Sequence, residues 1–304
     1  MARHIKDLFA AKRPVISFEV FPPKPGVRVD GLLDTLGALR ELNPDYVSVT
    51  YGAGGSSRAR TVEIASAAQN RWGLTALAHL TCIGQTRRDL EEVLEELEQE
   101  GITNVLALRG DPRDDCPPLD PPPFRYAADL VAYLRTSRKG DFCVGAAAYP
   151  EGHVECDDLE ADLRHLKEKV DAGVDFLVTQ LFFDNEIFFR FMDRLRELEI
   201  GVPVSVGIMP VLNSRQIGRM VSLCGASVPP KFARILARYE NAPEALRQAG
   251  IAYATEQIID LLSWGVAGIH IYTMNKPEIA QDIMKNIGVV RETLERGAKE
   301  EGPS

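Results

Sequence analysis

Eight short apolar runs in this sequence each end near a residue that could take part in chemistry, or in one case at a glycine. The first run, VISFEV, carries Glu19 between a phenylalanine and a valine, and two prolines follow shortly after it. A carboxyl group in apolar surroundings holds its proton to higher pH and can act as a general acid near neutral pH. The alternative is a carboxylate that pairs with a neighbouring strand. Because a buried acid inside a strand is costly, we favour the catalytic role.

The tripeptide Arg109-Gly110-Asp111 follows the run NVLAL. Glycine lets the backbone turn tightly and lets a ligand approach closely. An acid at this point could accept hydrogen bonds from the amino and ring N–H groups of a pterin or a purine. An ion pair between Arg109 and Asp111 explains the same residues equally well, and both interpretations stay open.

Other runs carry further candidates for ligand contacts at or near their ends: Thr50, His79, Tyr149, Gln180 and Tyr272. The Gln180 amide precedes Phe182 and Phe183, so it could hydrogen-bond the edge of a ligand ring that stacks on these aromatics. The aromatics could equally pack against a helix. The seventh run in chain order, VPVSVGI over 202–208, ends in glycine. The loop TYGAGGSS over 50–57 suits a backbone cradle for an anion or a flat ring but matches no dinucleotide or P-loop motif.

Two histidines merit comparison. We interpret His79 as the only histidine inside a strand, and such residues are more often hydrogen-bonded core residues than ligands. His153, in AAYPEGH, lies on an expected loop and is the better binding candidate. No histidines and carboxylates share the spacing of a metal site, so we predict no catalytic metal.

Helix-patterned stretches separate the apolar runs, so the chain alternates strand and helix eight times. This pattern predicts one domain over 1–304, a (β/α)8 barrel whose active site lies where the parallel strands end. A lead-in helix is expected within 1–13, and a frayed tail from 297. The segment 213–264 is too long for one barrel helix and predicts extra helices after the seventh strand.

The helix expected over 157–172 has an apolar stripe with 3.6-residue periodicity, formed by Leu159, Leu163, Leu166 and Val170. Along one border of the stripe lie Asp162, His165 and Lys169. From spacing alone, charges at such a border solvate the edge of the helix.

Composition narrows the class of protein. The net charge is −9, from 44 acidic and 35 basic residues, which argues against a nucleic-acid partner. The N-terminal residues contain no apolar signal segment, and no apolar stretch approaches the ~20 residues of a membrane span, so we expect a cytoplasmic protein. The five cysteines are scattered, which argues against a disulfide framework or a zinc site.

Taken in order, these motifs resemble those of methylenetetrahydrofolate reductase. The matching pieces are SFEVFPPK, YVSVTYGAGGS, LAHLTC, NVLALRGDP, YAADLV, AAYPEGH, ADLRHLKEKVDAG, TQLFFD, GIMPV and HIYTMNK, which run from residue 17 to 276. Each piece is a weak signal, but ten in register are highly specific. The resemblance implies an oxidoreductase acting on CH–NH donors. It would reduce 5,10-methylenetetrahydrofolate to 5-methyltetrahydrofolate with NAD(P)H by ping-pong hydride transfer through FAD, feeding methionine synthesis.

The resemblance also assigns roles to individual residues. Glu19 becomes the general acid that helps open the methylene bridge, and Asp111 lies by the flavin and the pterin. Gln180 bonds the pterin, while Tyr272 and Lys276 match a substrate-side motif. The residues implied to contact FAD are Thr50, His79, Arg109, Gly110, Asp111, Tyr149, His153, Asp162 and Lys169. We also expect a homo-oligomer.

Three rival interpretations share these observations: a flavin-free barrel that passes hydride directly to folate, an unrelated FAD barrel such as a proline dehydrogenase, and a catalytically silent barrel within a larger complex. The sequence departs from the family pattern at Val20, Ser205-Val206, Glu168 and Lys276. The last two changes lie where charged ligands are expected.

Overall fold

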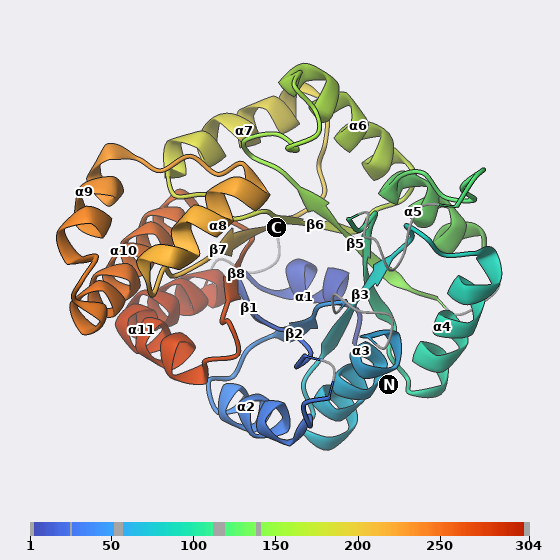
Figure 1. The fold of residues 1–304 in the computed structure, drawn as a ribbon, viewed down its shortest axis with the longest axis horizontal. Coiled ribbons are helices and arrows are strands. Elements are labelled where there is room, and N and C mark those ends of the chain that lie inside the picture. The colour runs from blue at the N-terminus through green and yellow to red at the C-terminus, as the bar shows by residue number, and fades with distance from the viewer. Residues whose placement is uncertain (1–2, 25, 52–56, 112–118, 138–140, 301–304) are drawn as a thin grey trace.

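Eight parallel strands close into a barrel in the order of the chain (Figure 1). The computed structural model describes residues 3–24, 26–51, 57–111, 119–137 and 141–300, without the side chains of 57, 58, 214–216, 219 and 298–300. The strands are β1 (Val15–Val20), β2 (Tyr46–Val49), β3 (Ala76–Thr81), β4 (Asn104–Leu108), β5 (Cys143–Ala148), β6 (Phe176–Thr179), β7 (Val204–Ile208) and β8 (Gly268–Tyr272). Each matches one of the eight apolar runs, so the predicted barrel is confirmed.

Helices surround the barrel on its outside, except α1, which lies across one end of it (Figure 1). They are α1 (Ile5–Ala11), α2 (Asp30–Arg40), α3 (Ser57–Ser66) with a π-helical turn η1 (Ala67–Arg71), α4 (Arg87–Gln99), α5 (Ala127–Thr136), α6 (Leu159–Asp171), α7 (Asn185–Glu197), α8 (Ser214–Cys224), α9 (Pro230–Tyr239), α10 (Pro243–Trp264) and α11 (Pro277–Glu300). The three extra pieces after β7 are therefore present as α8, α9 and α10. No helix among the described residues has the length and apolar character needed to cross a membrane.

Two expectations about helices need correction. The tail from 297 is not frayed at its start, because α11 continues to Glu300 through residues that favour helix; 301–304 lie outside the described residues. In the stripe of α6, Leu163 and Leu166 are buried, but Leu159 is 46% exposed. Leu159 is the first residue of the helix, and its side chain lies beside Gly152 of the preceding loop instead of on the barrel.

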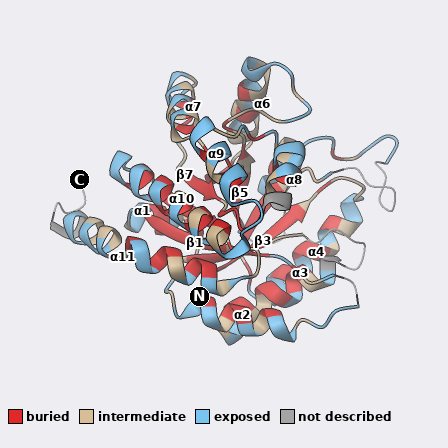
Figure 2. Cartoon of the chain, turned by 60° about the vertical axis from the view of Figure 1, so that its left-hand side comes forward, coloured by how far each residue is buried: buried red, intermediate tan, exposed pale blue. Residues whose placement is uncertain are grey.

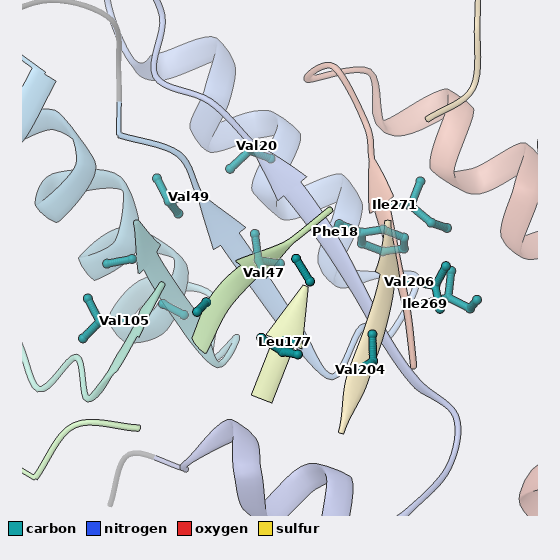
Figure 3. Packing of buried hydrophobic residues seen from close by; sticks show 14 of the residues in the cluster. Phe18, Val20, Val47, Val49, Val105, Leu177, Val204, Val206, Ile269 and Ile271 are labelled. Carbon is teal, nitrogen blue, oxygen red and sulfur yellow. The ribbon is translucent and has the colours of Figure 1, made fainter. Parts of the chain in front are cut away.

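The strands present two different faces because successive side chains in a strand point to opposite sides. Ile16, Phe18 and Val20 belong to the large aliphatic cluster that includes residues of the surrounding helices. Figure 3 shows strand residues of this cluster from close by, and Figure 2 shows the buried strands inside helices whose outer faces are exposed. The alternate residues of β1, Ser17 and Glu19, therefore point into the barrel.

Helix α1 closes the end of the barrel where the strands begin. Its residues Ile5, Leu8 and Phe9 form a second buried cluster with inward residues such as Tyr46 and Phe176. The Asn104 side chain accepts a hydrogen bond from the Ile5 backbone N–H at 2.9 Å, which fixes the start of the helix. With this end filled, the free space of the barrel lies at the opposite end.

Replacement of Phe176 by alanine tests this packing. The ring is fully buried, and its centroid lies 5.6 Å from that of Phe9. We expect the free energy of unfolding to fall by about 3–5 kcal/mol in urea denaturation, because the cavity left in a closed barrel collapses poorly. Val289→Ala, at a residue that is 75% exposed, is the control and should change it by less than about 0.5 kcal/mol. Similar stabilities for both variants would contradict this account of the core.

Candidate active site

A carboxyl group held between two imidazoles lies at the centre of the strand ends. Glu19 Oε2 is 3.3 Å from His270 Nε2 and 3.4 Å from His79 Nε2. The three residues come from β1, β8 and β3, so only the closed barrel brings them together. The surroundings of Glu19 are therefore more polar than its phenylalanine neighbours in the sequence suggested.

Each imidazole has a serine partner inside the barrel. Ser48 Oγ lies 2.6 Å from His79 Nε2, and Ser17 Oγ lies 2.8 Å from His270 Nδ1. Burial lowers the pKa of His79 to about 4, with the nearby Glu19 charge offsetting part of this effect. His79 is therefore neutral at physiological pH, with Nε2 bonded to Ser48 and 3.4 Å from the Glu19 carboxyl group.

The prediction that His79 is the only strand histidine was wrong. His270 lies in β8, is 1% exposed, and contacts the same carboxyl group. The run IHIYT held the signal, because His270 and Tyr272 are two residues apart and therefore share the inward face. Ser17 and Ser48 were also missed as members of the site.

Gly207 makes room for Tyr272, which explains the glycine near the end of the seventh run. The Tyr272 hydroxyl donates to the Thr179 carbonyl at 2.7 Å, and the Gly207 N–H donates to Thr179 Oγ1 at 2.9 Å. A Cβ at Gly207 would lie 2.3 Å from the Thr179 carbonyl oxygen and 2.7 Å from the Tyr272 hydroxyl. Burial raises the pKa of Tyr272 well above its usual value, so this hydroxyl stays protonated.

A pocket of about 810 Å³ opens above these residues. Among the predicted residues, those that line it are Glu19, His79, Tyr149, Gln180 and Tyr272. Its apolar wall includes Met209 and three residues of α8, namely Met220, Leu223 and Cys224, none of which the sequence analysis had identified. Their contribution depends on how α8 crosses the barrel mouth, which its sequence pattern does not reveal. Gln180 Oε1 accepts from the Leu181 N–H at 2.9 Å, so its NH₂ group remains the donor available for a ligand.

Several predicted cofactor residues meet around the loop between β5 and α6. The rings of Tyr149 and His153 are edge to face, with centroids 4.8 Å apart. The backbone N–H of His153 donates to Asp162 Oδ2 at 3.2 Å. Lys169 Nζ donates to the Ala147 carbonyl at 2.6 Å. Burial lowers the pKa of Lys169 to about 8, with Asp162 offsetting part of the shift. The result is a half-buried ammonium group held by the Ala147 carbonyl.

Arg109 is paired with Glu155. One guanidinium nitrogen lies 2.8 Å from Glu155 Oε1, the second also bonds the carboxylate, and Nε donates to the Gly110 carbonyl. The hydrogen bond to Glu155 raises the pKa of Arg109. Arg109 thus forms its ion pair with Glu155, 46 residues further along the chain, instead of with Asp111. Asp111 is exposed. Gly110 has φ +83°, as the predicted tight turn requires.

The remaining predicted residues lie away from the pocket lining. Thr50 follows β2, where its carbonyl accepts from the Thr61 hydroxyl at 3.1 Å. Lys276 is exposed at the start of α11. Part of the glycine loop, 52–56, lies outside the described residues.

A closed parallel barrel with a pocket at the strand ends is the architecture of (β/α)8-barrel enzymes. Within that class, the chain belongs to the methylenetetrahydrofolate reductase family, whose model matches residues 4–288. The 5,10-methylenetetrahydrofolate reductase of Escherichia coli is 37% identical over 274 residues, which cover 90% of each chain. The methylenetetrahydrofolate reductase (NADH) 1 of Arabidopsis thaliana is 36% identical over 301 residues, 95% of this chain and 51% of the relative. The chain thus spans about half the length of that plant relative.

Solved structures share the fold at low identity. A Clostridium thermocellum protein that binds two copies of 5-methyl-5,6,7,8-tetrahydrofolic acid has a TM-score of 0.63 at 13% identity, covering 94% of this chain and 98% of that one. Dihydropteroate synthase from Xanthomonas albilineans, in complex with 7,8-dihydropteroate, has a TM-score of 0.53 at 19% identity, covering 92% and 93%.

Gly207→Ala should disrupt the contact between Tyr272 and Thr179. We expect a loss of about 1–3 kcal/mol in the free energy of unfolding, because the added methyl overlaps backbone and ring atoms. Gly201→Ala, where a Cβ would meet nothing within 4 Å, is the matched control. An unchanged stability for Gly207→Ala, measured by urea unfolding, would show that the space is not needed.

The low pKa of His79 predicts a pH dependence of stability. Between about pH 4 and pH 6.5 the unfolded chain binds a proton that the folded His79 refuses, so the free energy of unfolding falls as pH falls through this window. His79→Gln should flatten that part of the curve, whereas His165→Gln, at an exposed residue of α6, should leave it unchanged. Identical slopes in urea unfolding for the wild type and His79→Gln would refute the assignment.

Proposed function

We propose that this chain reduces 5,10-methylenetetrahydrofolate to 5-methyltetrahydrofolate, with NAD(P)H as the reductant and FAD as the cofactor. The observation that carries the proposal is the Glu19 carboxyl group, which lines the pocket within 3.4 Å of two imidazoles. Membership of the reductase family supports the same activity. The product would feed methionine synthesis.

Glu19 is the proposed general acid. Opening the methylene bridge leaves an iminium at one ring nitrogen and requires a proton at the other, and a carboxylic acid in the pocket supplies it. His270 orients the carboxyl group by a hydrogen bond, and His79 Nε2 lies 3.4 Å from the same oxygen. The apolar wall of the pocket limits competing water, which strengthens these interactions.

Gln180 is the proposed contact for the pterin ring. Its carbonyl oxygen is occupied by the Leu181 N–H, so the amide NH₂ faces acceptor atoms of the ring edge. Asp111, although exposed and outside the lining, would accept from the pterin and tune the cofactor. Tyr272 closes the substrate side of the pocket, and Lys276 lies further out.

The residues around the β5–α6 loop fit FAD. Lys169 offers a half-buried cation for an anionic group, and Tyr149 offers a ring beside the pocket, with a phenol whose pKa burial raises to about 12. Asp162 and His153 connect these two residues. Thr50, Arg109 and Gly110 are the remaining proposed contacts of FAD. When bound, FAD would supply the relay of hydride between nicotinamide and folate.

The pocket favours one substrate at a time. Its volume of about 810 Å³ is that of a single small-molecule site, typically ~300–1,000 Å³. Use of this pocket by NAD(P)H and the folate in turn would give the proposed ping-pong reaction.

The proposal is tested by incubating the purified protein with methylenetetrahydrofolate and NADH or NADPH, with and without FAD. We expect 5-methyltetrahydrofolate by chromatography only when FAD is present. Product formed without FAD and without flavin absorption would favour the direct-hydride barrel. Proline oxidation without folate reduction would favour the proline dehydrogenase alternative, and no activity in either assay would favour a silent barrel.

Glu19→Gln should separate the two half-reactions. We expect the rate of folate reduction by the reduced protein to fall by roughly 10²–10⁴-fold, while reduction of the flavin by NAD(P)H continues. Stopped-flow absorbance measures both steps. Glu98→Gln, at an exposed carboxylate of α4, should match the wild type in both. Unchanged folate reduction in Glu19→Gln would remove Glu19 from the reaction.

A further inference from the structure

Two buried hydroxyl groups inside the barrel have no hydrogen-bond partner. Tyr46 Oη and Ser205 Oγ are among the few such atoms in the described residues, and both residues are 0% exposed. Leaving a buried hydroxyl unbonded is expensive, so each such group needs an explanation. Ser205 is also one of the residues at which this chain departs from the pattern of its family.

Tyr46 lies next to the residues that hold Glu19. Ser17 of β1 is in register with Tyr46 of β2 on one side and with His270 of β8 on the other. The rings of Tyr46 and His270 are stacked, with centroids 6.2 Å apart and planes 18° apart. Burial raises the pKa of Tyr46 to about 12, and the nearby hydroxyls of Ser17 and Ser205 offset part of the shift. The phenol is therefore a permanent donor beside Ser17.

The single proton of the Ser17 hydroxyl has two possible acceptors. His270 Nδ1 lies 2.8 Å from Ser17 Oγ, and the Ile269 carbonyl oxygen lies 3.3 Å away. If Ser17 donates to Nδ1, the other ring nitrogen of neutral His270 carries the proton and donates to the Glu19 carboxylate. If Ser17 donates to Ile269, Nδ1 carries the proton, and His270 Nε2 can only accept from a protonated Glu19. Which of the two acceptors the Ser17 hydroxyl donates to therefore depends on whether Glu19 is charged or protonated.

We propose that Tyr46 is a positioning residue for Glu19, because its hydroxyl and that of Ser205 complete a hydrogen-bonded chain through Ser17 and His270. In this chain Ser205 donates to Tyr46, Tyr46 to Ser17, Ser17 to His270 Nδ1, and His270 Nε2 to Glu19. Ser17 and Ser205 both lie near enough to the Tyr46 phenol to lower its pKa, so they are the partners within its reach. A hydrogen bond donated by the Tyr46 hydroxyl makes Ser17 a better donor to His270 Nδ1. His270 Nε2–H then becomes a better donor to Glu19 and stabilises the charged carboxylate.

Other titratable groups also face Glu19. His79 reaches it from β3 with Ser48 as its own partner, and Tyr272 lies beside it on β8. Asp45, Tyr149 and Cys224 act on the neighbouring tyrosines from further away. Removing the Tyr46 hydroxyl alters the His270 side of Glu19 and leaves the His79 side in place.

A first experiment reads His270 in the resting protein and does not depend on activity. In ¹⁵N NMR of the imidazoles near neutral pH, we expect His270 to carry its proton on Nε2 and to change its shifts in Tyr46→Phe. Thr103→Val is the matched control, because Thr103 Oγ1 is also a buried hydroxyl without a partner but lies just before β4, a strand that carries no residue of the proposed chain. A proton on Nδ1, or unchanged His270 shifts in Tyr46→Phe, would overturn the proposal.

A second experiment rests on the proposed function and measures folate reduction against pH. That step needs a proton on Glu19 and slows as pH rises. Loss of the chain leaves the carboxylate with a weaker donor, so Tyr46→Phe should move the pH of half-maximal rate upward by roughly half a unit to one unit. Ser205→Ala should shift it in the same direction, and the double variant no further than Tyr46→Phe, because Ser205 acts through Tyr46.

The outcomes distinguish the two proposals. Superimposable profiles for Tyr46→Phe and the wild type, or an equal shift in Thr103→Val, would refute the positioning role. If Tyr46→Phe does not fold, Ser205→Ala carries the same expectations in both experiments. A wild type that reduces no folate would defeat the proposed function, and the imidazole spectra would then decide the positioning role alone.

Discussion

The structure depends on placing one carboxyl group between two imidazoles inside a closed barrel. Burying an ionisable acid is expensive unless hydrogen bonds replace the lost water. Here His270 supplies one such bond and His79 Nε2 lies 3.4 Å from the same oxygen, and each imidazole bonds a serine on the strand beside it. The partners of Glu19 come from strands on different sides of β1, so the arrangement exists only after β1 has paired with both β2 and β8. Glu19 and its two histidines therefore come together only when the barrel closes.

One end of the barrel is packed and the other holds a pocket, because different side chains lie at the two ends. Phe176, Tyr46 and the residues of α1 fill the end where the strands begin, which fixes the strands without using their carboxyl ends. The other end keeps a pocket with two sides. Glu19 and His79 line its polar side, and the half-buried Lys169 bonds the Ala147 carbonyl toward the β5–α6 loop. A ring held near the loop could thus face a second ring placed over the acid.

The sequence predicted the fold well because strand and helix periodicities are local properties. All eight strands and the extra helices within 213–264 were readable from neighbouring residues. Glu19, His79, Tyr149, Gln180 and Tyr272 were placed correctly at one pocket because parallel strands end together.

The parts that the sequence did not predict depend on distant contacts. Glu155 is the partner of Arg109, whereas the sequence offered only Asp111, two residues along the chain, as one of two open interpretations. The wall formed by Met220 and Cys224 depends on the path of α8 across the barrel mouth. His270 is different, because alternation in IHIYT already places it on the inward face with Tyr272. Its omission was an error of interpretation.

A crystal structure of the protein with FAD and a bound folate tests the central claim most directly. The account predicts that a Glu19 carboxyl oxygen lies within hydrogen-bonding reach, about 2.6–3.2 Å, of the nitrogen released by the methylene bridge, directly or through one water. His79 and His270 should still contact the same carboxyl group. A folate bound with its bridge away from Glu19, or a Glu19 turned out of the pocket, would contradict it.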